Sequence, residues 1–209
     1  MNTPEPIVRV VDDDDSVRTG MVRLLQAAGY EAVGYGSAGD FLLGDPSRDT
    51  PGCIVLDVRM PGPSGLELQD ALTQHGVSLP IIFLTGHGDI PMSVRAMKAG
   101  AIDFLTKPIS RKTLLDAVQT ALARDAEQRV ASARVLTLRA RYETLTPRER
   151  EVFSGVTAGK LNKQIAAELG TAERTIKAHR AQVMEKMRVT SVADLVHIAG
   201  QLGNDGARE

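Results

Sequence analysis

The stretch Cys53-Ile54-Val55-Leu56-Asp57 places an acidic residue directly after four apolar ones. A short apolar run bounded by polar residues is typical of a strand that is buried on both faces of a sheet. Four similar runs occur in the same half of the chain, at 7–11, 32–35, 81–84 and 102–105. The sequence therefore predicts five buried strands, with Asp57 at the end of the third.

Segments with helical spacing separate these runs. Val17, Met21, Leu24 and Ala28 recur at intervals of four, three and four, and Gly29 then ends the pattern. Strands that alternate with helices predict an α/β fold, in which helices cover both faces of a parallel sheet. Five such units suggest the flavodoxin-like strand order 2-1-3-4-5, where ligands bind beyond the carboxyl ends of strands 1 and 3.

The composition allows two small domains with packed cores, because 43% of the 209 residues are apolar and 24% are charged. No run of about 18 apolar residues could span a membrane, and residues 1–6 have no signal-peptide pattern. Cys53 is the only cysteine, so it cannot form an internal disulfide, and its apolar neighbours predict a core residue. These features predict a cytoplasmic protein that does not associate with membranes.

Charge is distributed unevenly, although the net charge is only −1. Residues 1–125 hold 11 Lys and Arg against 16 Asp and Glu, whereas residues 126–141 hold four Arg against one Glu. Residues 142–209 hold 10 basic and nine acidic residues. This asymmetry is expected if only the C-terminal part meets a polyanion.

Residues 110–141 contain no Gly or Pro and predict one long helix. Its latter half is basic and only weakly amphipathic, so a flexible charged linker is the alternative. We therefore expect a domain at 1–125, a helical linker at 126–141 and a second domain at 142–209.

The second domain is expected to consist of four helices. Gly170 ends the second of them, and the last fades near Gly200. The predicted capping residues, in chain order, are Thr146, Asn162, Thr171 and Ser191. Two helices joined by a short turn that contains Gly are typical of a helix-turn-helix.

Acidic residues cluster at one edge of the predicted sheet. Asp12 and Asp13 follow the first strand and Asp57 ends the third, so these side chains are expected to converge. Several carboxylates in one place repel one another, and Mg²⁺ can offset that repulsion with its preference for oxygen ligands. Asp14 and Asp15 fit the solvated start of the next helix, where acidic residues are favoured.

Two further strand ends complete this cluster. The fourth strand ends at Thr85 and the fifth at Lys107. A carboxylate nucleophile, a metal, a hydroxyl donor and a cation are the parts needed to transfer a phosphoryl group to an aspartate.

These motifs resemble the receiver domain of two-component response regulators, over residues 7 to about 125. The matching segments are VDD at 11–13, LDVRMPG at 56–62, LTGHGD at 84–89 and FLTKP at 104–108. The segment TGHGD at 85–89 is most similar to the FixJ subgroup.

The resemblance implies that Asp57 accepts a phosphoryl group from a sensor histidine kinase. It implies that Asp13 ligates Mg²⁺ directly and Asp12 directly or through water, together with Asp57 and the backbone carbonyl of Arg59.

The resemblance also implies roles at the fourth and fifth strand ends. Thr85 would bind a phosphoryl oxygen and Lys107 would pair with it. Phe104 matches an aromatic switch position that rotates as Thr85 moves, and the alternative for Phe104 is a plain core residue. A cis bond is implied before Pro108, and His87 is expected to be a loop residue rather than a ligand.

The helix that follows Thr171 has an inner and an outer face. Ile176, Val183 and Met187 recur at seven and four and mark the inner face. One basic residue and several small ones on the outer face suit a helix that lies in the major groove of DNA. Those outward residues are Lys177, Ala178, Ala181 and Gln182. A helical bundle with a solvated basic face is the alternative.

The segments LTPREREV at 145–152, NKQIA at 162–166 and TIKAH at 175–179 resemble the LuxR/FixJ-type helix-turn-helix. The resemblance implies that Lys177, Ala178 and Ala181 read bases, and that Lys163, Thr175 and His179 contact phosphates. Arg180 could reach either group. The last helix can pair two such domains through the stripe of Val192, Leu195 and Val196, and core packing is the alternative for about half of the stripe's side chains.

We interpret the chain as a transcriptional activator that is controlled by phosphorylation and is not an enzyme. The expected partners are a sensor histidine kinase, promoter DNA, RNA polymerase and, after phosphorylation, a second copy of the chain. In a two-fold dimer, the basic side chains of Arg95 and Lys98 would pair with Asp103 of the other copy.

Two alternatives come from other classes of protein. Dehalogenase-like phosphatases also form an aspartyl phosphate, but they need a second Asp where this chain has Arg59. The second alternative is a receiver whose output domain binds protein rather than DNA. The spacing of Lys163 and Lys177 argues against this alternative.

Overall fold

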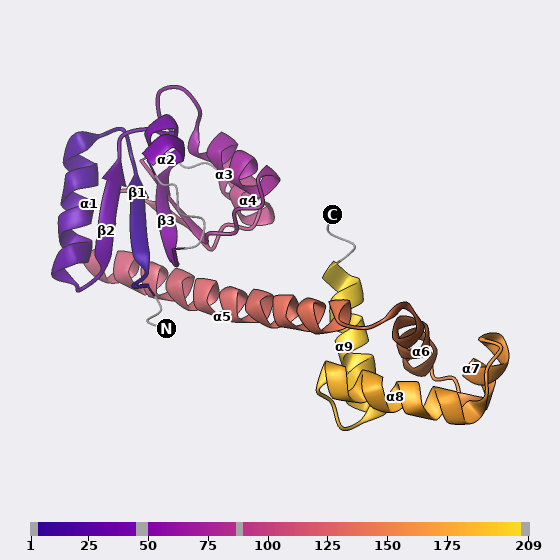
Figure 1. The fold of residues 1–209 in the computed structure, drawn as a ribbon. Coiled ribbons are helices and arrows are strands. Elements are labelled where there is room, and N and C mark those ends of the chain that lie inside the picture. Colours follow the sequence, from indigo (N-terminus) through magenta and orange to yellow (C-terminus); the bar gives the residue numbers. More distant parts are fainter. Residues whose placement is uncertain (1–3, 45–49, 87–89, 206–209) are drawn as a thin grey trace. The chain divides into compact units, whose positions relative to one another are not determined.

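A computed structural model describes residues 4–44, 50–86 and 90–205. The chain forms two compact units, Met1–Arg129 and Val130–Glu209, each with its own core (Figure 1). His87 lies outside the described residues. Within the described part, no helix combines the length and the apolar content needed to cross a bilayer.

The N-terminal unit is built on a five-stranded parallel sheet with the order β2-β1-β3-β4-β5, so the predicted order is confirmed. The strands are β1 Ile7–Val11, β2 Glu31–Tyr35, β3 Gly52–Asp57, β4 Ile81–Thr85 and β5 Asp103–Thr106. The central strand β3 is buried along its whole length, as expected for a strand with helices on both sides.

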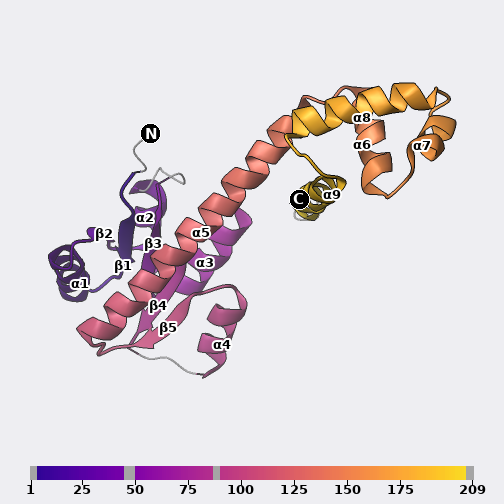
Figure 2. The ribbon, with the colours of Figure 1, turned by 90° about the horizontal axis from the view of Figure 1, so that it is seen from below.

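Helices cover both faces of this sheet (Figure 1 and Figure 2). Ile54 and Leu56 of β3 pack under α2, α3 and α4, whereas Cys53 and Val55 pack under α1 and the first turns of α5. These helices are α1 Asp15–Ala27, α2 Ala38–Gly44, α3 Gly65–Gln74, α4 Ile90–Lys98 and α5 Arg111–Glu143. The alternation of side chains along β3 thus divides the core into two layers.

Cys53 is fully buried in the second of these layers, which confirms the predicted core role. Burial raises the pKa of its thiol to about 12. Because the thiolate is the reactive form of cysteine, this side chain packs as a small apolar residue.

The helix α5 is continuous from Arg111 to Glu143, so the alternative of a flexible linker at 126–141 is wrong. Its two halves belong to different units. Asp125 accepts hydrogen bonds from the Gly52 amide (2.9 Å) and from Arg129 Nε (2.8 Å), which fastens the helix to the start of β3. Leu138 is instead buried in the core of the C-terminal unit.

The C-terminal unit adds α6 Pro147–Thr157, α7 Asn162–Glu168, α8 Glu173–Met187 and α9 Val192–Asp205. The predicted cap of α6 is confirmed: Thr146 Oγ1 accepts from the Glu149 amide at 3.3 Å, and Glu149 Oε2 accepts from the Thr146 amide at 2.7 Å. Pro147 occupies the first helical position, where its missing N–H costs nothing.

Three predicted helix boundaries are wrong, two helix starts and one helix end. Leu161, not Asn162, is the N-cap of α7, and the Gln164 side chain accepts from its amide. Ala172, not Thr171, precedes α8 and offers no side-chain cap. The last helix continues past Gly200 to Asp205, since packing outweighs the poor helix propensity of one glycine.

Glu149 gives the C-terminal unit a pH-dependent contribution to stability. The hydrogen bond from Lys186 Nζ (2.6 Å) lowers the pKa of this carboxyl below its usual value of 4.5. A lowered pKa stabilises the fold above the unfolded-state pKa, and the contribution is lost as pH falls through the folded-state pKa. We expect Glu149→Gln to lower the melting temperature at pH 7 and to flatten its decline below pH 4.5. Equal pH profiles for Glu149→Gln and the exposed control Glu151→Gln would contradict this.

Candidate functional site

Polar side chains meet at the carboxyl edge of the sheet. Asp12 follows β1, Asp57 ends β3, Thr85 ends β4 and Lys107 follows β5. Lys107 Nζ lies 2.6 Å from Asp12 Oδ2 and 2.9 Å from Asp57 Oδ1. The side chains predicted at these three strand ends are therefore brought into contact, although Asp12 and Lys107 are 95 residues apart.

Burial and charge determine the titration of this cluster. Asp12 and Asp57 are both buried. Burial raises the pKa of Asp57, and the hydrogen bond from Lys107 opposes part of that rise. Burial also pushes the pKa of Lys107 down, but its hydrogen bonds to Asp12 and Asp57 push it up further, so that it is raised. Lys107 therefore remains a cation beside two carboxylates.

The backbone around Asp57 holds its carboxylate in place. Asp57 Oδ2 accepts a hydrogen bond from the Arg59 amide at 2.9 Å. The Gly65 amide donates to the Val58 carbonyl at 3.0 Å, which ties the loop to the start of α3. A Cβ on Gly65 would lie only 2.2 Å from the Asp57 carbonyl oxygen, so glycine is required there.

The three acidic residues that follow Asp12 after β1 have separate roles. Asp14 caps α1, since its side chain accepts from the Ser16 and Val17 amides. Asp15 pairs with Arg18. Both fit the predicted solvated helix start. Asp13 is exposed.

The donors at this edge suit a hard cation. Among the described residues, no three carboxylate, imidazole or thiol side chains converge as a protein-only metal cage requires. Mg²⁺ usually takes only one or two carboxylates and keeps several waters. Asp12 and Asp57 already hold a cation, the Lys107 ammonium, between oxygen atoms alone. This donor chemistry fits Mg²⁺.

The predicted switch residues lie beside this cluster. Thr85 is fully buried. Phe104 is half-buried and its ring centroid lies 6.0 Å from that of Phe83 in the core. The Lys107–Pro108 bond is cis.

The second site is the outer face of α8. Ile176, Val183 and Met187 are fully buried, as predicted for the inner face. The four residues predicted to face outward are exposed: Lys177, Ala178, Ala181 and Gln182. Lys163 of α7 is also exposed.

Three other predicted DNA contacts are half-buried: Thr175, His179 and Arg180. Arg180 NH1 donates to Asn162 Oδ1 at 2.9 Å, which ties α8 to α7. Arg174, which the sequence pattern did not single out, is also exposed on α8, one turn before Ala178. Its spacing of three from Lys177 was the available signal.

The predicted dimer residues have mixed surroundings. Lys98 is exposed and Asp103 is half-buried. Arg95 NH2 pairs with Asp70 Oδ2 at 2.7 Å within the same unit, and both side chains are exposed.

The apolar stripe on α9 requires a correction. Leu195 is fully buried in the core of its own unit, so it cannot contact a partner. Val192 packs partly against that core, whereas Val196 is 45% exposed.

Residues 8–119 match the family model of the response regulator receiver domain. Residues 143–199 match that of the bacterial regulatory proteins of the luxR family. The chain belongs to the FixJ/NarL family of response regulators. Its domains are those of DNA-binding regulators and not of enzymes, so neither a phosphatase nor a protein-binding output domain describes it.

Other response regulators align with this chain over most of their own length. Nodulation protein W of Bradyrhizobium diazoefficiens is 50% identical over 197 residues, covering 94% of this chain and 86% of that protein. The transcriptional regulatory protein FixJ of Azorhizobium caulinodans is 43% identical, covering 94% and 93%. The solved structure of the response regulator StyR has a TM-score of 0.81 and 49% identity, covering 94% and 99%.

Proposed function

We propose that Asp57 accepts a phosphoryl group from a sensor histidine kinase, and that the phosphorylated chain dimerises on promoter DNA and activates transcription with RNA polymerase. One observation carries the proposal: a buried carboxylate, Asp57, lies beside the Lys107 cation at the carboxyl edge of the sheet.

In the transfer step, an Asp57 carboxylate oxygen forms a bond to phosphorus. The bond between phosphorus and the kinase imidazole nitrogen breaks, and the imidazole leaves with its electron pair and takes up a proton. Lys107 offsets the negative charge and the Thr85 hydroxyl donates to a phosphoryl oxygen. Asp12, Asp13, Asp57 and the Arg59 carbonyl would hold Mg²⁺, which neutralises phosphoryl oxygens when bound.

DNA contact is assigned to α8 and the start of α7. Lys177, Ala178 and Ala181 present a narrow face that can lie deep in the major groove, where Lys177 can reach a guanine. Contacts to DNA phosphates are assigned to Lys163, Thr175 and His179. Such contacts position a protein on the duplex without reading its sequence. Arg180 is hydrogen-bonded to Asn162, so it can contact a base or a phosphate only if that hydrogen bond breaks.

We expect Lys177→Ala to weaken specific DNA binding by about 1–3 kcal/mol if the lysine contacts guanine. A phosphate contact would instead give a loss that is uniform across sequences, with a shallower salt dependence. Fluorescence anisotropy with selected promoter fragments measures both. Lys160→Ala is the matched control, because Lys160 pairs with Glu168 at 2.7 Å, outside the predicted DNA contacts. Unchanged affinity in a folded Lys177→Ala protein would remove this residue from the interface.

Dimerisation is assigned to α4 and β5. Besides Arg95 and Lys98, α4 exposes three apolar side chains, Ile90 (79%), Val94 (45%) and Met97 (46%). A partly apolar face with opposite charges suits an isologous interface, where each patch meets its own copy. The exposed Arg95–Asp70 pair stabilises the fold by at most about 1 kcal/mol, so it can be exchanged for a contact across the dimer.

We expect the phosphorylated chain to sediment as a dimer at micromolar concentration, and Arg95→Glu to prevent this without slowing phosphorylation. Arg23→Glu, an equivalent change on the exposed face of α1, should leave the dimer intact. A phosphorylated chain that remains monomeric both free and on DNA would exclude dimerisation and favour simple unmasking of the DNA-binding domain.

A further inference from the structure

Arg18 lies in the first turn of α1, and its side chain reaches back to the residue that follows β1. Only 19% of this side chain is exposed, although arginine is usually solvated. Arg18 NH1 donates to the Asp12 carbonyl at 2.7 Å, and its NH2 group pairs with the exposed carboxylate of Asp15. The roles in phosphorylation and DNA binding assigned above do not use this arginine.

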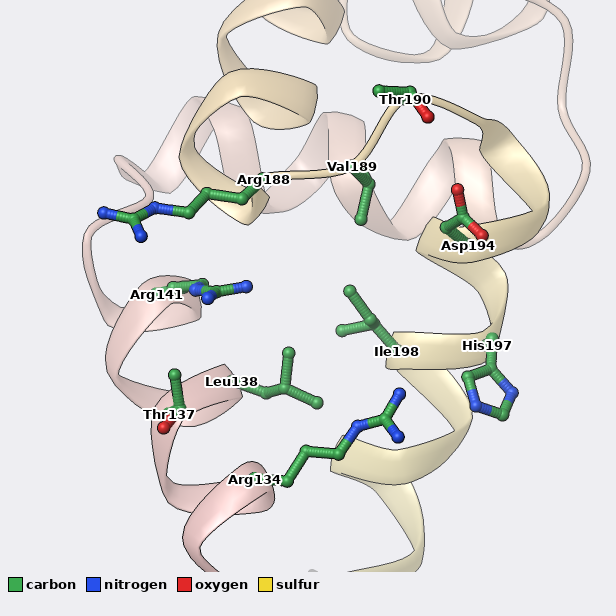
Figure 3. A pocket seen from close by; sticks show the side chains of 10 residues that line it. All are labelled: Arg134, Thr137, Leu138, Arg141, Arg188, Val189, Thr190, Asp194, His197 and Ile198. Carbon is green, nitrogen blue, oxygen red and sulfur yellow. The ribbon is translucent and has the colours of Figure 1, made fainter.

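The bond from Arg18 to the Asp12 carbonyl is short. Arg141, one of the residues that line the pocket in Figure 3, also contacts a main-chain carbonyl, that of Met187, but at 3.4 Å. A distance of 2.7 Å is typical of a hydrogen bond from a charged donor, which is about twice as strong as a neutral one. The bond from Arg18 is thus a strong restraint on the backbone at Asp12.

The other polar groups of Asp12 also have partners. Its amide donates to the Tyr35 carbonyl of β2 at 3.1 Å. Its carboxylate accepts from the Asp14 amide at 3.0 Å and from Lys107 Nζ at 2.6 Å. Arg18 adds the bond to the carbonyl, and this bond fixes the peptide group that follows Asp12.

A glycine in β2 provides the space for the arginine stem. A Cβ on Gly34 would lie 3.0 Å from Arg18 Cγ and 3.2 Å from Arg18 Cδ, closer than side chains normally pack. The backbone does not require glycine at this position, since Gly34 is not among the residues with positive φ. Glycine weakens the interior of a strand and often marks the close approach of another group. The approach of Arg18 accounts for Gly34.

We propose that Arg18 is a positioning residue for the magnesium site. By holding the Asp12 carbonyl, it fixes the peptide group between Asp12 and Asp13, and with it the direction from which both carboxylates approach the ion. Arg18 does not contact the ion itself, and Gly34 contributes by leaving room for the arginine. This inference rests on the proposed function, which assigns both carboxylates to Mg²⁺.

The charge of Arg18 allows positioning to be separated from electrostatics. A nearby cation repels Mg²⁺, so the loss of charge alone would tighten Mg²⁺ binding. Loss of an outer partner that orients a metal ligand instead weakens metal binding by about 10–100-fold. We therefore expect Arg18→Ala to weaken Mg²⁺ binding, against the direction that its charge would give.

The test follows Mg²⁺ binding through the amide NMR signals of Asp13 and Arg59 in the full-length chain. The native chain should show saturable shifts, and Arg18→Ala should need at least about tenfold more Mg²⁺ to reach the same saturation. Arg23→Ala is the matched control, because it removes an exposed arginine of α1. It should bind Mg²⁺ as the native chain does.

The outcomes separate the role of Arg18 from the magnesium site itself. If Arg18 is merely structural, Arg18→Ala lowers the melting temperature and leaves the Mg²⁺ affinity unchanged. If its charge is all that matters, Arg18→Ala binds Mg²⁺ more tightly. Either result overturns the proposal while the magnesium site stands. A native chain without saturable shifts would contradict the magnesium site, and the proposal would fall with it.

A second variant displaces Arg18 without removing it. In Gly34→Ala the new Cβ would lie 3.0 Å from Arg18 Cγ, so the arginine stem must shift. Mg²⁺ binding should weaken, although by less than in Arg18→Ala. In the Arg18→Ala background the same glycine substitution should cause no further loss, because the two residues act as a coupled pair. Equal losses in both backgrounds would contradict the assignment of Gly34 to Arg18.

Discussion

Replacing Asp57 by asparagine is expected to abolish phosphorylation. Among the described residues, Asp57 is the only carboxylate at this edge that is buried, hydrogen-bonded by Lys107 and placed at the end of the central strand. An amide cannot act as the nucleophile. Intact mass after incubation with acetyl phosphate and Mg²⁺ measures the outcome: the native chain gains one phosphoryl group and Asp57→Asn gains none. Withholding Mg²⁺ should also prevent the gain.

Asp14→Asn is the matched control, because asparagine also caps a helix and Asp14 serves only as the cap of α1. Burial raises the pKa of Asp57, so its contribution to stability is present below the unfolded-state pKa and is lost as pH rises through the folded-state pKa. The neutral Asp57→Asn chain should therefore melt no lower than the native one at pH 7. An Asp57→Asn chain that gains a phosphoryl group at the native rate would show that another residue is the acceptor.

Gly65→Ala is expected to destabilise the N-terminal unit and slow phosphorylation. The new Cβ would lie 2.2 Å from the Asp57 carbonyl oxygen, and because that atom is backbone, the end of β3 or the start of α3 must move. Overpacking of this kind costs about 1–3 kcal/mol, which corresponds to a fall of roughly 3–15 °C in melting temperature for a unit of this size.

Gly20→Ala provides the contrast for Gly65→Ala. Gly20 lies within α1, and nothing lies within 4 Å of the position of its Cβ. Alanine there should stabilise the fold by about 0.5–1 kcal/mol through its higher helix propensity. Equal melting temperatures for Gly65→Ala and the native chain would show that the contact with Asp57 is not restrictive.

The polar cluster at the carboxyl edge of the sheet could be predicted because strand ends in a parallel sheet are adjacent in space. Five apolar runs set the strand order, and the polar residues that follow them, Asp12, Asp57, Thr85 and Lys107, had to share one edge. The inner face of α8 was predictable for a similar reason, since burial follows the helical period.

Features that depend on contacts distant in the sequence were not predictable. Asp125 bonds to the Gly52 amide across 73 residues, and no periodic pattern marks such a contact. The N-cap residues Leu161 and Ala172 offer no capping side chain of their own, so a search for capping residues misses both helix starts by one residue. Leu195 has the spacing of an exposed stripe, yet the fold of its own unit buries it.

The measurement that tests the central claim most directly is the affinity for a selected promoter fragment before and after phosphorylation. We predict that acetyl phosphate with Mg²⁺ raises the affinity of the native chain at least about tenfold, because a dimer binds two half-sites at once. The Asp57→Asn chain should show no change. Equal affinities of the native chain with and without a phosphoryl group on Asp57 would contradict phosphorylation-controlled DNA binding.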